Sequence, residues 1–203
     1  MENERIQVFR LDGTLLRSWG HLGSQPGLFS SPFAVTVHGD LVVVSDQGNH
    51  RVQVFRLDGT FVRQFGSPGA APGQLDLPRG TAISAAGEIF VCDYLNHRVT
   101  VFDFESGAHL RSWGQLGAQP GEFDSPSRNA IVGEQEILVG DFNNDRVQVF
   151  RLDGTFVRCL NVPAGRHGPF QPSGIAVTPT GGVVLCDYRN HRIWVDPAGT
   201  VGA

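Results

Sequence analysis

Arginine and aromatic side chains are the residues of this sequence best suited to binding chemistry. Four arginines fall outside the regular spacing of the others: Arg79, Arg128, Arg166 and Arg189. Regularly spaced aspartates are followed by three aromatic residues: Tyr94, Phe142 and Tyr188. Guanidinium groups among exposed aromatic rings suit stacking on nucleic-acid bases or anchoring a peptide. We therefore take these seven residues as the candidate binding set.

The sequence does not indicate a catalytic or metal site. The predicted inner strands offer only Asn129, with His38 just past one end, which is too few for a metal held by three or more protein ligands. No serine has a paired histidine and acid in a recurring context. Three histidines share one repeat position and should therefore lie far apart: His50, His97 and His191. We predict no enzymatic activity, no metal and no cofactor.

The elements that position the candidates follow a repeat of 46 to 48 residues. Its most regular members are four aspartates, each followed five residues later by an arginine: Asp46, Asp93, Asp141 and Asp187, with Arg51, Arg98, Arg146 and Arg192. A period in the forties indicates one supersecondary unit used repeatedly, in a solenoid or a propeller. A residue needed in every unit is expected to hold that unit together, so we assign these eight residues to the structure.

The repeat resembles a known family. The resemblance rests on three segments, Asn49-His50-Arg51-Val52, Asn96-His97-Arg98-Val99 and Asn190-His191-Arg192-Ile193, and on Asn144-Asp145-Arg146-Val147, where aspartate replaces histidine. These segments look like the NHL repeat, and the likeness includes the Leu-Asp-Gly-Thr turn and the Pro-Gly-x-Phe loop that follow. It covers essentially the whole chain. It implies an all-β fold, an NHL-type β-propeller, usually of six blades, that serves mostly as a binding platform.

We expect a single domain over residues 1–203, with four four-stranded blades and an N-terminal hairpin. The blades are predicted at 31–66, 78–114, 126–161 and 172–203, and residues 1–20 would supply part of another blade. The outer strand of the last blade would be a stub at Thr200–Val201. This falls short of six blades, so the ring is expected to be incomplete or open. The alternatives are a fragment of a longer parent chain, a small ring with a spare hairpin, or a homodimer.

Strand order predicts that the candidate residues share one face. Neighbouring strands of a blade run in opposite directions, so the turns between second and third strands lie on the same side as the loops between blades. All four arginines and the three aromatic residues fall in or beside these connections. The face is of mixed charge, because the same loops carry three acids: Asp76, Glu122 and Asp124.

Composition limits the functional classes. The net charge of −4 argues against a surface built entirely for nucleic acid. All sixteen basic residues are arginine, which excludes lysine Schiff-base chemistry and a P-loop lysine. Three cysteines make no disulfide framework, and we expect Cys92 and Cys186 to be packed structural thiols. The sequence has no apolar signal segment or membrane span, so a cytoplasmic protein without membrane contact is expected.

The first functional hypothesis is a non-catalytic binding or scaffold module for a protein or peptide partner. The NHL resemblance implies one form of this role, the substrate-recognition part of a ubiquitin-ligase system, whose RING domain this sequence lacks. The alternative is binding of single-stranded RNA by the arginine and aromatic residues. A third, weaker hypothesis is a metal-dependent propeller hydrolase or lyase.

Overall fold

The structure, a computed structural model, describes residues 3–196, which form five antiparallel sheets. The N-terminal hairpin is β1 (Ile6–Phe9) and β2 (Leu15–Trp19). Blade 1 is β3 (Pro32–His38), β4 (Leu41–Asp46), β5 (Arg51–Arg56) and β6 (Phe61–Phe65), with the short 3-10 helix η1 (Gln47–Asn49) between β4 and β5. Blade 2 is β7 (Pro78–Ile83), β8 (Glu88–Asp93), β9 (Arg98–Asp103) and β10 (His109–Trp113). Blade 3 is β11 (Pro126–Val132), β12 (Glu136–Asp141), β13 (Arg146–Arg151) and β14 (Phe156–Cys159), and blade 4 is β15 (Pro172–Val177), β16 (Val183–Asp187) and β17 (Arg192–Asp196).

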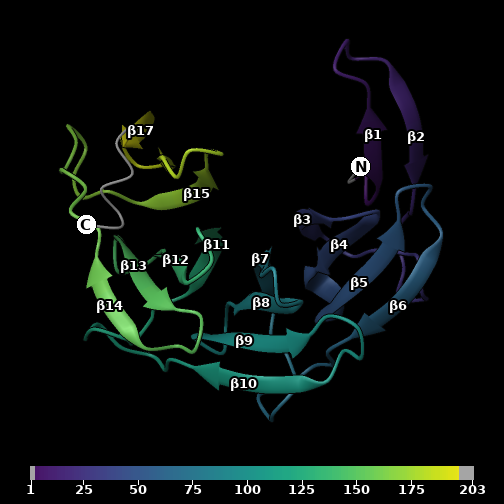
Figure 1. The fold of residues 1–203 in the computed structure, drawn as a ribbon, viewed down its shortest axis with the longest axis horizontal. Coiled ribbons are helices and arrows are strands. Elements are labelled where there is room, and N and C mark those ends of the chain that lie inside the picture. The colour runs from purple at the N-terminus through teal and green to yellow at the C-terminus, as the bar shows by residue number, and fades with distance from the viewer. Residues whose placement is uncertain (1–2, 197–203) are drawn as a thin grey trace.

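The sheets follow one another around an open arc, with β7 and β11 on its inside and β10 and β14 on its outside (Figure 1). The N-terminal hairpin and blade 4 stand at its two ends. The predicted all-β propeller architecture is confirmed. The predicted stub at Thr200–Val201 lies outside the described residues. Within the described part of the chain, no helix is long and apolar enough to span a membrane.

The predicted Asp-Gly turns join the two outer strands of the blades. Gly59 and Gly154 have φ of +91° and +95°, a region that glycine enters without steric cost. The Asp58 carboxylate accepts a hydrogen bond from the Thr60 N–H at 2.8 Å, and Asp153 does the same for Thr155. These hydrogen bonds lower the pKa of both aspartates. The turn is therefore closed by its own side chain, as Asp-Gly sequences permit.

The hydrophobic core lies between the blades. One residue from each inter-blade loop is buried there: Phe29, Leu75, Phe123 and Phe170. Phe123 is fully buried and its ring lies 5.4 Å from that of Phe150, centroid to centroid. Gly114 makes room for it, since a Cβ at that position would stand 2.4 Å from the Phe123 ring. We call these four residues the inter-blade plugs.

Three arginines on outer strands tie one sheet to the next. Arg63 of β6 donates to the Phe104 carbonyl oxygen at 2.6 Å, and Arg111 of β10 donates to the Leu152 carbonyl oxygen at 2.6 Å. Arg17 of the hairpin reaches the Leu57 carbonyl oxygen of blade 1 in the same way, at 3.1 Å. These three arginines therefore connect neighbouring sheets.

The Glu88–Arg111 pair predicts a pH effect on stability. Two hydrogen bonds of 2.7 and 2.8 Å from Arg111 lower the pKa of Glu88. The pair should therefore stabilise the fold above the unfolded carboxyl pKa of about 4.3, and this contribution should be lost as the pH falls through the lower folded pKa. We expect Glu88→Gln to lower the free energy of unfolding by about 0.5–1 kcal/mol at neutral pH. Urea melts should show that the deficit shrinks near roughly pH 3, and an equal deficit at both pH values would contradict this origin.

Candidate functional site

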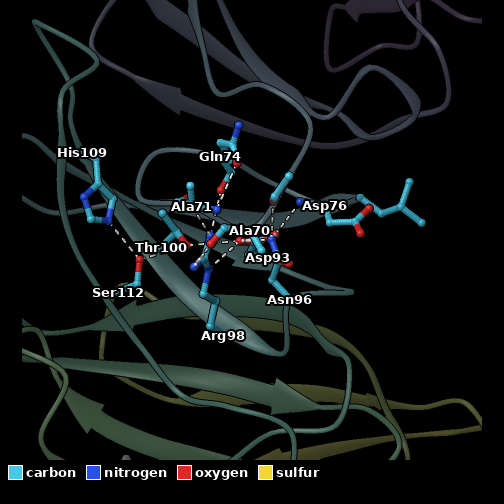
Figure 2. Close-up of polar contacts among 12 residues, drawn as sticks. Ala70, Ala71, Gln74, Asp76, Asp93, Asn96, Arg98, Thr100, His109 and Ser112 are labelled. Atoms are coloured by element: carbon cyan, nitrogen blue, oxygen red, sulfur yellow. Dashed lines mark hydrogen bonds and ion pairs between the residues drawn. The ribbon is translucent and has the colours of Figure 1, made fainter.

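The repeated aspartate is the centre of a buried polar network in each blade, shown for Asp93 in Figure 2. Its carboxylate accepts hydrogen bonds from the Asp76 N–H at 2.6 Å, from Arg98 Nε at 2.8 Å and from Asn96 Nδ2 at 2.9 Å. Arg98 in turn donates to loop carbonyl oxygens, at 2.8 Å to Ala70 and at 2.9 Å to Gln74. The aspartate and arginine thus hold the inter-blade loop on its own blade.

The repeated aspartates are all buried, but the direction of their pKa shift differs along the arc. Desolvation raises the pKa of Asp93 and of Asp141, although their hydrogen-bond donors act in the opposite direction. At Asp187, burial also acts to raise the pKa, but donors from Gln171, Arg192 and Asn190 prevail and the pKa is lowered. Asp187 lies in the last described sheet, at one end of the arc. Its carboxylate therefore keeps the same kinds of hydrogen-bond donor but has no further described blade beside it.

The structure contains a serine–histidine pair that the sequence analysis did not predict. Ser112 Oγ lies 3.0 Å from His109 Nε2, and a chain of hydrogen bonds runs on through Thr100 to Asp93 (Figure 2). The ionised Asp93 can only accept, so Thr100 donates to it, and Ser112 donates to Thr100. The Ser112 hydroxyl proton therefore points to Thr100 and not to His109. In the Ser112–His109 hydrogen bond, His109 Nε2–H must be the donor. This direction makes the chain a structural relay, and it does not activate Ser112 as a nucleophile.

The signature histidines connect neighbouring blades. His50 Nδ1 accepts the Leu77 N–H at 3.3 Å, and His97 Nδ1 accepts the Ser125 N–H at 3.1 Å. Both N–H groups belong to residues of the next inter-blade loop with positive φ. In blade 3, Asp145 fills the position and pairs with Arg189 of blade 4 at 2.7 Å. Arg189 is therefore engaged in holding two blades together.

Two of the candidate arginines meet over aromatic rings at the start of the inner strands. The central guanidinium carbon of Arg79 lies 3.3 Å from the Tyr94 ring centroid and 4.8 Å from that of Phe33. The same atom of Arg128 lies 4.0 Å from the Phe33 centroid. Arg128 also donates from Nε to the Ser173 carbonyl oxygen at 3.2 Å. We call Phe33, Arg79, Tyr94 and Arg128 the arginine–aromatic cluster.

The other candidates do not join this cluster. Arg166 and Tyr188 are exposed, and no contact links either of them to the four residues. Phe142 is half-buried beside the turn of blade 3. Phe33 was missed by the sequence analysis, because it occupies a repeat position that is serine in blades 3 and 4. Its signal in the sequence was the proline before it, which begins every inner strand.

Asn129 and His38, which the sequence analysis considered as metal ligands, lie on the inner strands β11 and β3. A hollow of about 480 Å³ is lined by inner-strand residues, among them Thr36, Thr81 and Asn129. Asn129 donates to the Phe90 carbonyl oxygen at 2.9 Å, and His38 packs its ring against Phe104. Among residues 3–196, no three His, Cys, Asp or Glu side chains are grouped as metal ligands would be.

Two protein families match parts of the chain. The NHL repeat matches residues 171–195, and a 6-bladed beta-propeller family matches residues 82–168. No curated protein matches the chain significantly. The first match contains Asn190, His191 and Arg192, which belong to the repeated signature.

Solved structures share the fold at low sequence identity. A catalytically inactive virginiamycin B lyase from Staphylococcus aureus with quinupristin is 14% identical, with a TM-score of 0.67 over 95% of this chain and 62% of that chain. A protein of unknown function from Bacteroides caccae is 13% identical, with a TM-score of 0.67 over 94% and 66%. Hydrazine synthase of Kuenenia stuttgartiensis is 16% identical, with a TM-score of 0.61 over 78% and 43%.

The chain thus spans less than two thirds of the length of each of these structures, and their likeness concerns the fold alone. The NHL match covers nearly all of the described strands of blade 4, and the propeller match runs from the end of β7 to the loop that follows β14. These matches support an NHL-type β-propeller family for this chain.

Proposed function

We propose that this propeller is a non-catalytic module that recognises a protein or peptide partner through its loop face, the side formed by the inter-blade loops and the turns between second and third strands. The propeller fold supports a general binding or scaffold role. One observation carries the finer proposal. The arginine–aromatic cluster gathers side chains of the types that anchor protein partners, and neither of its arginines forms an ion pair within the described residues 3–196.

Four other arginines on this face are already used by the fold. Arg51, Arg98 and Arg146 each pair with a buried aspartate, and Arg189 pairs with Asp145. Arg79 and Arg128 instead lie half-buried on aromatic rings. Aromatic and arginine side chains held in this way lose little entropy on binding, which suits them as anchors. In a ubiquitin-ligase system, a module of this kind would contribute recognition of the substrate.

Single-stranded RNA is the second candidate partner, because arginine and aromatic side chains can also stack on bases. The charge of the face favours a protein. Asp76 and Asp124 lie on the neighbouring loops, and the net charge is −4. Nucleic acid usually requires several phosphate contacts on a basic surface.

Selection of displayed random peptides on the purified chain tests the proposal. We expect enriched peptides whose binding weakens roughly tenfold or more in Phe33→Ala and in Tyr94→Ala. Tyr188→Ala, an exposed aromatic on the same face but outside the cluster, should bind as the wild type does. If no peptide is enriched, while an RNA oligomer binds with an affinity that falls steeply with salt, the peptide proposal is wrong.

A further inference from the structure

Arg79 and Arg128 differ from every other arginine in the described part of the chain. Nine arginines form ion pairs with carboxylates, within 4 Å: Arg51, Arg56, Arg63, Arg98, Arg111, Arg146, Arg158, Arg189 and Arg192. Five others have no such partner but are exposed to solvent: Arg5, Arg10, Arg17, Arg151 and Arg166. Only Arg79 and Arg128 are partly buried and lack a carboxylate among residues 3–196.

The fold holds these two positive charges close together. Burial lowers the pKa of both arginines, and the charge of Arg79 lowers that of Arg128 further. Arginine nevertheless stays protonated in proteins, so both charges persist. Buried nitrogen atoms of each guanidinium, Nε of Arg79 and Nη1 of Arg128, have no hydrogen-bond partner among residues 3–196. Two neighbouring cations with free donors form a site whose electrostatics are satisfied by an anion.

The backbone is shaped to bring them together. Gly80 stands beside Arg128, and a Cβ on Gly80 would lie 2.8 Å from the Arg128 Cα and 2.9 Å from the Asn129 nitrogen. The absence of a side chain therefore lets β7 approach β11 closely at this level. The Ser173 carbonyl oxygen on β15 accepts a hydrogen bond from Arg128 Nε and thereby holds the arginine side chain in place. Phe33 supplies the ring that both guanidinium groups share.

We propose that Arg79 and Arg128 bind a carboxylate of the partner, so that this module selects peptides carrying an aspartate or glutamate. The inference rests on the proposed function, since it assigns the chemical group that the same face recognises. Guanidinium groups match carboxylates in geometry as well as in charge. Asp76 and Asp124 on the adjoining loops would repel further negative charge. The site therefore suits a single carboxylate flanked by neutral residues better than a chain of phosphates.

Paired peptides provide the test. Peptides enriched on the wild-type chain should contain an acidic residue, and replacing that residue with its amide should weaken binding at least about tenfold. Arg79→Gln and Arg128→Gln should remove this preference, so that acidic and amide peptides bind the variants alike. Arg166→Gln, which deletes the same charge from an exposed site on the same face, should retain it.

The outcomes separate the two proposals. If enriched peptides are neutral, or if Arg79→Gln and Arg128→Gln keep the acidic preference, the carboxylate site is wrong while peptide binding stands. If no peptide is enriched, the proposed function fails first.

Thermal melts give an independent readout, because succinate should raise the melting temperature of the wild type above that in sodium chloride of equal ionic strength. The double variant Arg79→Gln, Arg128→Gln should lose this shift, and an equal shift in both proteins, or a larger one with inorganic phosphate, would overturn the inference.

Discussion

Replacing Asp93 with alanine is expected to lower the free energy of unfolding by about 3–5 kcal/mol, because it leaves a buried guanidinium without its counterion. Asp93 is fully buried and accepts hydrogen bonds from Arg98, Asn96 and the Asp76 backbone (Figure 2). Its loss would also free the loop that leads into blade 2. Equilibrium denaturation in urea measures the change, and near-ultraviolet circular dichroism reports whether the blade keeps its packing.

Asp187→Ala is the matched control for this variant. Asp187 makes the same contact with its arginine, at 2.9 Å, but the Arg192 side chain is 34% exposed, compared with 16% for Arg98. Water can therefore replace more of the lost interaction, and we expect a clearly smaller loss of stability. Equal losses at the two positions would show that burial of the pair does not decide its contribution.

Phe123→Ala is expected to cost about 3–5 kcal/mol of stability, since the plug between blades 2 and 3 is fully buried and its removal leaves a cavity. The ring contacts a cluster from both blades that includes Phe90, Ile137 and Phe150. Phe123→Leu is the control, because Leu75 fills the equivalent position between blades 1 and 2. We expect the leucine variant to lose less than half as much.

Thermal and urea melts of the two plug variants should both remain cooperative if the plug acts through packing alone. A loss for Phe123→Leu as large as that for Phe123→Ala would contradict a simple cavity effect. It would indicate that the aromatic contact with Phe150, 5.4 Å between centroids, dominates the interface.

The repeat made much of this architecture predictable. Alignment of the chain with itself locates the blades, the Asp-Gly turns, the Asp46–Arg51 type of pair and the plugs, since each occurs several times. Residues that recur must satisfy the same local geometry in every blade. Their structural roles can therefore be inferred by comparing the copies of the repeat. The inner strands, for example, begin at a proline in all four blades.

The candidate site was predicted only in part, because a site is where the copies differ. Arg79 and Arg128 were found as irregular arginines, but their shared ring, Phe33, was not. Arg189 is irregular for another reason: it compensates for the aspartate at 145, which replaces a histidine in blade 3. The pairing of Ser112 with His109 was also missed, since a register irregularity in β10 brings residues three apart into contact. Such contacts depend on three-dimensional positions that periodicity does not specify.

The signature position gives the arc a direction. His50 and His97 each secure the loop of the blade that follows, and Asp145 does so through Arg189. A blade is thus fastened by its predecessor, in the way that adjacent units of a repeat protein depend on their neighbours. At the downstream end, Ile193 and Val195 are 64% and 54% exposed, whereas Val147 and Val149 at the same positions of blade 3 are fully covered. Opening of the described arc should therefore begin as fraying at blade 4 and travel backwards, one blade at a time.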